Sequence, residues 1–514
     1  MPALTQVKNF GAIAAEDDDI KRFFVQTPVY GRLLSGDKQV VIGRKGSGKS
    51  ALYLAMIGGG NENVRRAPTF FARGLAFRDY PWALHARYAH EATTRYERFL
   101  SSWRFLAFLE IFKVLLTEND RGERYQDKEM KRALSGVEKF IQKNWGAIAF
   151  DYRKTFPSGG FALDGLSFGP QAFGFGLGSI DVKSAGNLSQ TLERLNEWLW
   201  NALQVVGPRA PKVYVLFDEL DAGYDPTADD YVDRVVGLLL AMRRLSREFR
   251  DARLPFLAIA FLRSDIYDSL HFGDKNKLTE TNVAFLSWNE DLHYHDSSLK
   301  QLIDHRIREA MNLASNVKDP WDKAFDAQIM RGTQHKFHHM TFRSYLRPRD
   351  IIKFANCALD EARQRFSSDG GSLTEFFITN ADMSAARRPY SRYMLSELDD
   401  EIAASAPRWG DYVEVLRRLQ ATKFSRKAFE DACEDVKARG ITFDQNVDEL
   451  LEFFYRYSII GFERAAGASG LEHHFKYLDE TIRFNPRASS FMVHRGLKEA
   501  LELRDSGDAI DTIE

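Results

Sequence analysis

The chain has 514 residues, 44% of them hydrophobic and 28% charged, which is ordinary for a globular protein and too long for one hydrophobic core, so two to four domains are expected. The 71 Lys and Arg nearly balance the 72 Asp and Glu, and a net charge of −1 excludes a general attraction to nucleic acid or anionic membranes, though not a local basic patch. Two cysteines, Cys357 and Cys433, exclude a disulfide framework, and without a signal-like start or a run of roughly 18 apolar residues we expect a cytoplasmic protein with no membrane partner.

The first functional pattern is Gly43-Arg44-Lys45-Gly46-Ser47-Gly48-Lys49-Ser50, which matches the phosphate-binding loop G-x-x-x-x-G-K-[ST] at every fixed position. Residues 39–42 before it predict a buried strand, and residues 51–57 after it predict an apolar helix. Glycines let backbone N–H groups surround phosphate oxygens, and the helix N-terminus adds a partial positive charge. We therefore expect Gly43 to Ala51 to bind a nucleoside triphosphate, with Lys49 on the β- and γ-phosphates and the Ser50 hydroxyl on Mg²⁺.

The next region mixes helical and glycine-rich stretches. Residues 68–73 predict a second strand, and residues 82–116 carry apolar side chains at helical spacing. Residues 155–190 break that pattern, and we expect a β-hairpin folded onto the domain; the alternative is an exposed loop that binds a partner. The aromatic residues among these glycines are Phe161, Phe168, Phe173 and Phe175. The helical pattern resumes over residues 188–205.

A second site pattern begins with the apolar residues 212–217, which predict a buried parallel strand and are followed by Asp218-Glu219. Ligands of open α/β sheets bind outside the carboxyl ends of the strands, so this acidic pair is expected beside the phosphate-binding loop. We predict that Asp218 is the Mg²⁺ partner, directly or through water, and that Glu219 is the base that orients the attacking water. Asp221 is a candidate for a supporting carboxylate.

Three further elements complete the predicted sheet domain. Residues 231–250 predict an amphipathic helix whose terminal arginines suit the helix dipole. Residues 255–262 predict a buried strand that ends in Arg263, and beside the Asp218 strand this Arg would point toward the γ-phosphate. Residues 282–286 predict the last strand.

Taken together, these motifs resemble those of an AAA+ P-loop ATPase, nearest to the origin-recognition and STAND-like bacterial branch. The resemblance rests on Ile42 to Leu52, Leu216 to Asp221 and Leu262 to Tyr267, and covers roughly residues 20–360. It implies an α/β parallel sheet with a helical lid, ATP and Mg²⁺ as ligands, and Arg263 at the sensor 1 position.

The helical lid is expected over residues 291–366. Within it, the stretch from Arg343 to Ile352 resembles the sensor 2 region, in which an Arg at a helix start reaches the γ-phosphate. Arg349 directly follows a proline, at the first turn of a new helix, and is our first choice for this role, with Arg347 second. The alternative is a surface Arg349 paired with Asp350.

One stretch departs from the family. Between the sensor 1 helix and the last strand, where AAA+ rings carry a trans-acting arginine finger, this chain has Gly273-Asp274-Lys275-Asn276-Lys277. Either a lysine substitutes, or another residue supplies the finger, or the protein does not hydrolyse ATP in a ring.

The last part of the chain follows a linker at residues 367–372. Residues 459–462 and 474–477 predict two strands joined by a glycine-containing turn. Helices followed by such a hairpin resemble a winged helix, whose basic residues could contact phosphates. Those residues are Arg464, Lys476, Arg483, Arg487 and Arg495. Interleaved acidic residues make docking of a partner protein or self-association an equal alternative.

The predicted domains are an ATPase core over residues 1–290 with an insertion at about 82–205, the lid over 291–366, and a mainly α, winged-helix-like domain over 373–514. We expect an ATPase that couples its nucleotide state to conformational change or assembly. One alternative is a regulatory switch that holds ATP with little hydrolysis and recruits an effector protein; another is a DNA-binding ATPase that acts through the winged helix. The resemblance also implies a role in bacterial anti-phage defence.

Overall fold

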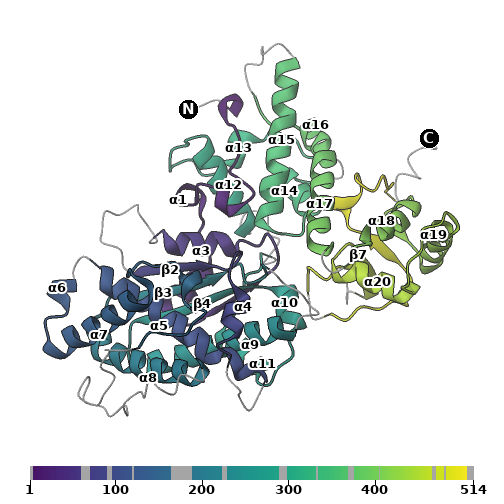
Figure 1. Cartoon of the computed structure of the whole chain (residues 1–514). Helices are drawn as coiled ribbons and strands as arrows, with labels where there is room; N and C mark the ends of the chain where they lie inside the picture. The colour runs from purple at the N-terminus through teal and green to yellow at the C-terminus, as the bar shows by residue number, and fades with distance from the viewer. Residues whose placement is uncertain are drawn as a thin grey trace, which may run out of the picture. The chain divides into compact units, whose positions relative to one another are not determined.

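The structure is a computed structural model, and the chain in it divides into two compact units (Figure 1). The N-terminal unit is Ile20–Leu286, and the C-terminal unit is Met1–Asp19 with Ser287–Glu514. The residues that the structure describes are 4–58, 70–89, 95–118, 121–163, 188–222, 229–288, 298–330, 334–368, 376–403, 406–465, 471–479 and 482–505.

Five parallel strands form the sheet of the N-terminal unit, in the order β2-β3-β4-β1-β5. Their bounds are β1 Val40–Gly43, β2 Phe71–Ala76, β3 Val213–Asp218, β4 Phe256–Arg263 and β5 Val283–Phe285. The strand β4 therefore lies between β1, which leads into the phosphate-binding loop, and β3, which ends in Asp218. Because all five strands run the same way, the residues that follow β1, β3 and β4 meet at one edge of the sheet.

The helices of this unit precede, connect and cover the strands. Their bounds are α1 Ile20–Phe23, α2 Pro28–Ser35, α3 Lys49–Ile57, α4 Trp82–Ala86, α5 Leu100–Thr117, α6 Arg121–Arg124, α7 Lys128–Trp145, α8 Leu188–Val206, α9 Asp229–Asp251, α10 Ser264–Ser269 and α11 Lys275–Asn282. Short 3₁₀ turns lie at Arg95–Phe99, Tyr152–Lys154 and Gly207–Arg209.

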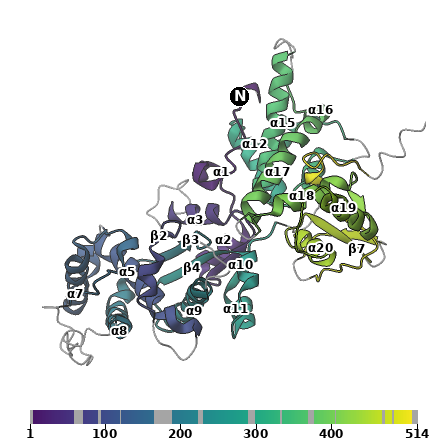
Figure 2. The same cartoon turned by 45° about the vertical axis from the view of Figure 1, so that its right-hand side comes forward.

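Both faces of the sheet are covered, which explains why its central strands are apolar at consecutive positions. All six residues of β3 are buried. Tyr214 and Leu216 pack into a cluster with α2 and α3, whereas Val213, Val215 and Phe217 pack into a larger cluster with α5, α8 and α9. Figures 1 and 2 show α3 on one face of the sheet and α9 on the other.

The insertion between β2 and β3 is built around α5, which has buried residues on every side. Such a helix lies inside a core rather than at its surface. The helix predicted over residues 82–116 is interrupted: α4 ends at Ala86, and α5 begins at Leu100 after a 3₁₀ turn. The hairpin predicted around Phe168, Phe173 and Phe175 lies outside the described residues.

The C-terminal unit begins with a group of helices. Their bounds are α12 Ser298–Ala310, α13 Trp321–Ala324, α14 Lys336–Thr341, α15 Pro348–Ser368, α16 Asn380–Ala385 and α17 Arg387–Ile402. The proline at the start of α15 suits its first position, because the missing N–H has no partner there in any helix.

The N-terminal segment, which the sequence-based division assigns to the ATPase core, packs in the C-terminal unit. The backbone N–H of Phe10 donates to Asn356 Oδ1 at 2.8 Å, and Arg306 Nη2 contacts Asp18 Oδ2 at 2.6 Å. Arg306 Nη1 also donates to the carbonyl of Phe10 at 3.1 Å. The two members of each pair are separated by about three hundred positions in the sequence, so no local pattern reveals the contact.

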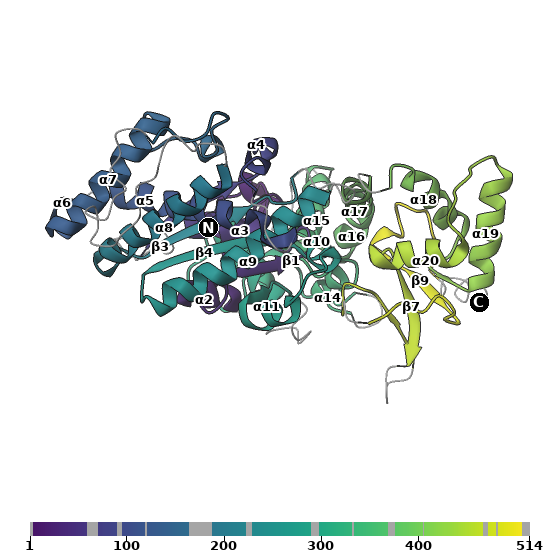
Figure 3. The ribbon, with the colours of Figure 1, turned by 60° about the horizontal axis from the view of Figure 1, so that its bottom comes forward.

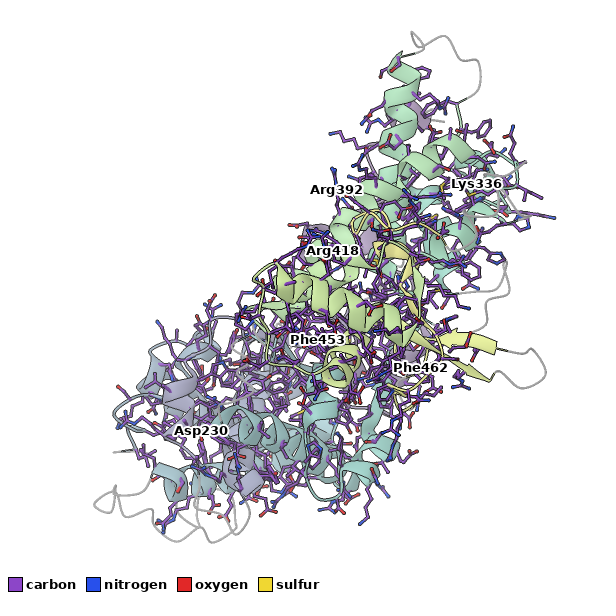
Figure 4. The ribbon with its side chains drawn as sticks, turned by 90° about the vertical axis from the view of Figure 1, so that its right-hand side faces the viewer. Asp230, Lys336, Arg392, Arg418, Phe453 and Phe462 are labelled. Carbon is purple, nitrogen blue, oxygen red and sulfur yellow. The ribbon has the colours of Figure 1, made fainter. Side chains whose placement is uncertain are left out.

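In the remainder of the C-terminal unit, the described residues form three α-helices and a small antiparallel sheet in the order β6-β9-β7-β8. The bounds are α18 Trp409–Arg418, β6 Lys423–Phe424, α19 Arg426–Ala438, α20 Val447–Arg456, β7 Ile460–Ala465, β8 Leu471–His474 and β9 Phe491–Val493. Figure 3 shows β7 and β9 beside α20, and Figure 4 labels Phe453 on α20 and Phe462 on β7.

The predicted hairpin is present, but its second strand, β8, lies three residues earlier in the chain than predicted. Residues 474–477 were expected to form it, whereas β8 ends at His474, which pairs with Phe462. Register across a hairpin is decided by the pairing of the two strands, which the sequence of either strand alone does not specify.

Within the described residues, no helix combines the length and the apolar character needed to cross a membrane.

Candidate functional site

The phosphate-binding loop connects β1 to α3 at the carboxyl edge of the sheet. Gly46 and Gly48 have φ angles of 81° and 98°, which glycine adopts without the steric penalty of a side chain. A Cβ at Gly43 would lie 2.5 Å from Ser47 Oγ, so any larger residue there would displace the Ser47 side chain. The loop therefore turns sharply into α3, whose first N–H groups lack intrahelical partners and can face an anion.

Lys49 is the first residue of α3, and its side chain folds back over the loop. Its Nζ donates to the carbonyl oxygens of Gly43 at 2.8 Å and Arg44 at 3.0 Å. Burial lowers the pKa of Lys49 to about 8, and the negative charges of Asp218 and Asp221 oppose that shift. The ammonium is thus held by neutral backbone oxygens, in a position where phosphate oxygens could replace them.

Asp218 is the last residue of β3 and is 5% exposed. Burial raises the pKa of its carboxyl to about 6, while the N–H of Glu219, the charge of Lys49 and the hydroxyl of Ser50 oppose the shift. The Ser50 hydroxyl therefore lies near enough to the Asp218 carboxyl to influence its protonation. Two such oxygen donors fit Mg²⁺, which commonly takes one or two protein ligands and completes its shell with phosphate oxygens and water.

Glu219 directly follows β3 and has a φ of 55°, in the left-handed region that costs a non-glycine residue roughly 1–2 kcal/mol. Strained backbone of this kind often occurs at functional sites. Its Oε1 accepts a hydrogen bond from Arg78 Nη2 at 3.0 Å. The Arg78 side chain is 71% exposed, so this ion pair is weak and can be broken at little cost.

Arg263 ends β4, opposite Gly43 in the register of β1 and β4. Its guanidinium contacts Asp265 through two bonds, Nε to Oδ1 at 3.0 Å and Nη2 to Oδ2 at 2.7 Å. Nη1 also lies 3.4 Å from Asp221 Oδ2. The side chain is thus placed at the same edge of the sheet as Lys49, and two carboxylates hold it there.

The stretch from Gly273 to Lys277, which departs from the family because it has no Arg, carries two lysines with different surroundings. Lys275 Nζ donates to the carbonyls of Tyr267 at 2.7 Å and Leu270 at 2.9 Å, so it secures the end of α10. Lys277 is 70% exposed and contacts Asp274 at 3.0 Å. Of these two lysines, Lys277 is the one that a neighbouring molecule could reach.

Arg349 and Arg347 belong to the C-terminal unit, and each has a carboxylate partner within it. Arg349 Nη1 lies 2.8 Å from Glu397 Oε2, so the alternative pairing of Arg349 with Asp350 is wrong. Asp350 instead pairs with Arg347 through Nε at 2.8 Å and Nη2 at 3.1 Å. Arg347 is 4% exposed, and the contact with Asp350 raises the pKa of its guanidinium despite burial.

The structure therefore brings the loop from Gly43 to Ala51 together with Asp218, Glu219 and Arg263 in one unit. One residue beside them was missed by sequence reasoning, namely Arg78. Arg78 lies two residues after the end of β2. It can reach Glu219 only because β2 is the neighbour of β3, with Ala76 opposite Asp218. Strand order is a tertiary property, so only the position of Arg78 behind a strand could have suggested it.

Two known proteins or families are similar to parts of the chain. Residues 297–399 match a family described as the FunZ-associated C-terminal helical domain, which spans α12 to most of α17. The chain is also 23% identical over 442 residues to a protein of Escherichia coli (strain K12) named putative transposon gamma-delta 80.3 kDa protein. That alignment covers 82% of this chain and 54% of the relative, so the chain spans about half the length of the protein it matches.

Proposed function

We infer that the protein is a Mg²⁺-dependent ATPase of the AAA+-like type. The observation that carries this proposal is the arrangement of Lys49, Ser50 and Asp218 at one edge of a parallel sheet, with the Ser50 hydroxyl near the Asp218 carboxylate and the Lys49 ammonium on the carbonyl oxygen of Gly43. A cation, a hydroxyl and a carboxylate gathered at one edge of the sheet are what a metal-bound triphosphate requires. The parallel α/β core with helices on both faces supports the same proposal.

In the proposed reaction, water attacks the γ-phosphorus and the bond to the β-γ bridging oxygen breaks. Glu219 accepts a proton from this water and orients it. Lys49 stabilises the charge that develops on the phosphate oxygens, and Arg263 is the candidate for a second cation beside them. When bound between Ser50 and Asp218, Mg²⁺ supplies further charge neutralisation. Arg349 is proposed as a lid cation, and ATP rather than GTP follows from the resemblance.

The decisive test is ATP turnover by the purified protein and by Glu219→Gln. We expect the variant to bind ATP as the parent does and to lose hydrolysis by about 100-fold or more, because a positioned base typically contributes that much. Lys49→Ala should lose binding as well. Glu129→Gln, which changes an exposed carboxylate on α7, is the matched control and should leave turnover unchanged. Full turnover in Glu219→Gln would remove Glu219 from the mechanism.

A second candidate function is a regulatory switch that holds ATP with little hydrolysis. The contact that favours it is the pairing of Arg263 with Asp265 through two bonds, and Glu219 is in addition weakly paired with Arg78. Both side chains must leave these partners before they can act on a γ-phosphate. Tight ATP binding without turnover, together with an ATP-dependent change of mass in solution, would support the switch. Rapid turnover by the isolated protein would exclude it.

The DNA-binding alternative acts through the C-terminal part of the chain, where α18 to α20 and the β7–β8 hairpin form the proposed winged helix. Arg483 and Arg487 are exposed there, although Arg464 already pairs with Glu472 at 3.4 Å. Similarity to a relative named for a transposon makes DNA a relevant ligand to test. Salt-dependent binding that disappears when Arg464, Lys476 and Arg483 are neutralised would support it, and no binding at low salt would exclude it.

The proposed biological setting is a cytoplasmic bacterial system in which this ATPase associates with itself or with an effector protein, and anti-phage defence is the role that the resemblance implies. Effector chemistry is assigned to the partner. A direct test compares phage sensitivity of cells that carry the intact protein with cells that carry Lys49→Ala. Equal sensitivity would remove this role and leave the ATPase proposal unaffected.

A further inference from the structure

A polar cavity lies within the C-terminal unit, and the proposed ATPase function makes no use of it. Its volume is about 510 Å³. Its lining comes from α14 and the residue pair Phe342-Arg343, from α16 and the start of α17, and from the segment at Arg495 to Asp505. The matched helical family ends at residue 399, so the cavity combines that domain with the last described part of the chain.

The charge of this lining is strongly positive. Among the described residues, four cations line it, Arg343, Arg387, Arg495 and Lys498, against a single carboxylate, Asp505. Lys498 pairs with that carboxylate. Arg343 pairs at 3.2 Å with Glu499, which lies outside the lining. Within the described residues, no carboxylate pairs with Arg387 or Arg495, so two guanidinium charges remain uncompensated in the cavity.

Arg387 is oriented by a neutral histidine. Its Nε donates to His339 Nε2 at 3.0 Å, and His339 Nδ1 lies 3.1 Å from Gln334 Oε1. Since Nε2 accepts, Nδ1 must carry the proton. Burial, and then the charges of Arg343, Arg387 and Arg495, lower the pKa of His339 to about 3, so it stays neutral at physiological pH. No other described residue is bonded to the two Nη groups of Arg387, which present to a ligand the fork geometry that suits phosphate.

An exposed aromatic ring stands in the same lining. Phe342 is 57% exposed, which is unusual for a phenylalanine, and the Arg495 guanidinium lies 5.9 Å from the centre of its ring. Exposed aromatic side chains beside cations are the platforms on which nucleobases stack in nucleic-acid-binding proteins.

The wall that carries Arg495 is fixed to the helices. Arg343 Nη1 donates to the carbonyl of Arg495 at 3.0 Å, and the N–H of Ala500 donates to Ser391 Oγ at 2.9 Å. Gly496 lies so close to the backbone of Arg343 that a Cβ there would be 2.2 Å from the Arg343 carbonyl oxygen. The cations from distant parts of the chain are therefore held in place before any ligand arrives, which lowers the entropic cost of binding.

We propose that this cavity binds a nucleotide, with its phosphate on Arg387 and Arg495 and its base against Phe342. An acidic peptide would satisfy the cations but would leave the exposed ring unexplained, and an apolar ligand would leave the charges uncompensated. The proposal does not depend on ATP hydrolysis at Lys49. The nucleotide is either a free small molecule or the end of a nucleic acid strand, since both offer the same phosphate and base.

The test measures binding of inorganic pyrophosphate, of AMP and of a 5′-phosphorylated single-stranded oligonucleotide by calorimetry at low salt. All proteins carry Lys49→Ala, so the phosphate-binding loop does not contribute. Arg387→Ala and Arg495→Glu should each weaken all three probes by about tenfold or more, because a hydrogen bond to a charged group contributes that much. Phe342→Leu should weaken AMP and the oligonucleotide and leave pyrophosphate unchanged, because only the first two carry a base.

The matched control is Arg392→Ala, which removes an exposed Arg of α17 outside the lining and is labelled in Figure 4. It should bind like the parent. Arg495 is exposed, so its replacement keeps the test valid if Arg387→Ala fails to fold. Tighter binding of AMP than of the oligonucleotide would identify a free nucleotide, and the reverse would identify a strand end. No binding of any probe, or equal losses in Arg392→Ala and Arg495→Glu, would overturn the proposal and leave the ATPase assay unaffected.

Discussion

At the scale of single residues, burial of the Asp218 carboxylate in the candidate site lowers the free energy of unfolding at neutral pH. The pKa of Asp218 rises from 3.8 to about 6 because the carboxyl is buried. The folded state binds the Asp218 carboxyl proton more tightly than the unfolded state does. The free energy of unfolding therefore falls as the pH rises from 3.8 to about 6. At neutral pH the cost is on the order of 3 kcal/mol.

We therefore predict that Asp218→Asn stabilises the nucleotide-free protein at pH 7 by about 1–3 kcal/mol, because an uncharged amide avoids the desolvation cost. The gain should shrink as the pH is lowered from 6 toward 4, where the carboxyl is protonated in the folded state. Denaturant unfolding of both proteins across this pH range measures it. A pH-independent difference, or a loss of stability at pH 7, would contradict the role of burial.

The contact between Arg78 and Glu219 leads to a second prediction. Arg78→Ala removes a partner that Glu219 must leave before it can orient water, and the pair is worth less than about 1 kcal/mol because Arg78 is exposed. Basal ATP turnover should therefore rise by up to about fivefold, with unchanged affinity for ATP. Steady-state kinetics check this, with Arg98→Ala as a control on the same unit. A fall in turnover would mean that Arg78 assists the reaction.

At the scale of elements, the approach of β2 to α3 depends on one glycine. A Cβ on Gly74 would lie 2.4 Å from Tyr53 Oη and 2.3 Å from Ile57 Cδ1. Gly74→Ala should destabilise the N-terminal unit by about 1–3 kcal/mol, because overpacking displaces α3, the helix that begins at Lys49. ATP affinity should fall with it.

The control for Gly74→Ala is a glycine substitution that should increase stability instead of lowering it. Gly31 lies within α2 and has open space where a Cβ would stand. Gly31→Ala should stabilise the same unit by roughly 0.5–1 kcal/mol through helix propensity. Thermal unfolding of both variants, monitored with and without ATP, tests the pair. Equal effects of the two substitutions would show that contact with α3 does not matter.

At the scale of the whole molecule, the chain divides into two units, and the N-terminal segment belongs to the C-terminal unit. The side chains of Asp18 and Arg306 are 2% and 8% exposed. Arg306→Met would leave the carboxylate buried without a cation, which costs about 3–5 kcal/mol. We predict a large loss of stability in the C-terminal unit, with ATP binding by the N-terminal unit retained.

Calorimetric unfolding with and without ATP separates these effects, because ATP should raise the transition of the N-terminal unit alone. Arg417→Met is the control, since its partner Glu414 and Arg417 itself are 32% and 44% exposed and such a pair contributes little. A parallel loss of ATP binding in Arg306→Met would show that the units unfold together.

Local sequence determined most of the elements and the positions at which they end. The glycine spacing and the apolar runs placed the phosphate-binding loop between a strand and a helix, the structure ends β3 at Asp218 and β4 at Arg263, and the proline before Arg349 begins α15. These features depend on residues within a few positions of one another, where periodicity and turn chemistry act directly.

Only the tertiary structure decided that β4 separates β1 from β3, that Arg78 reaches Glu219, and that Asp18 joins the C-terminal unit. It also placed Arg387 and Arg495 in one cavity. Such contacts join residues separated by about one hundred positions or more. They form only when chain topology, strand order and the packing of helices on the sheet are all compatible. A local pattern carries no information about which distant side chain completes it.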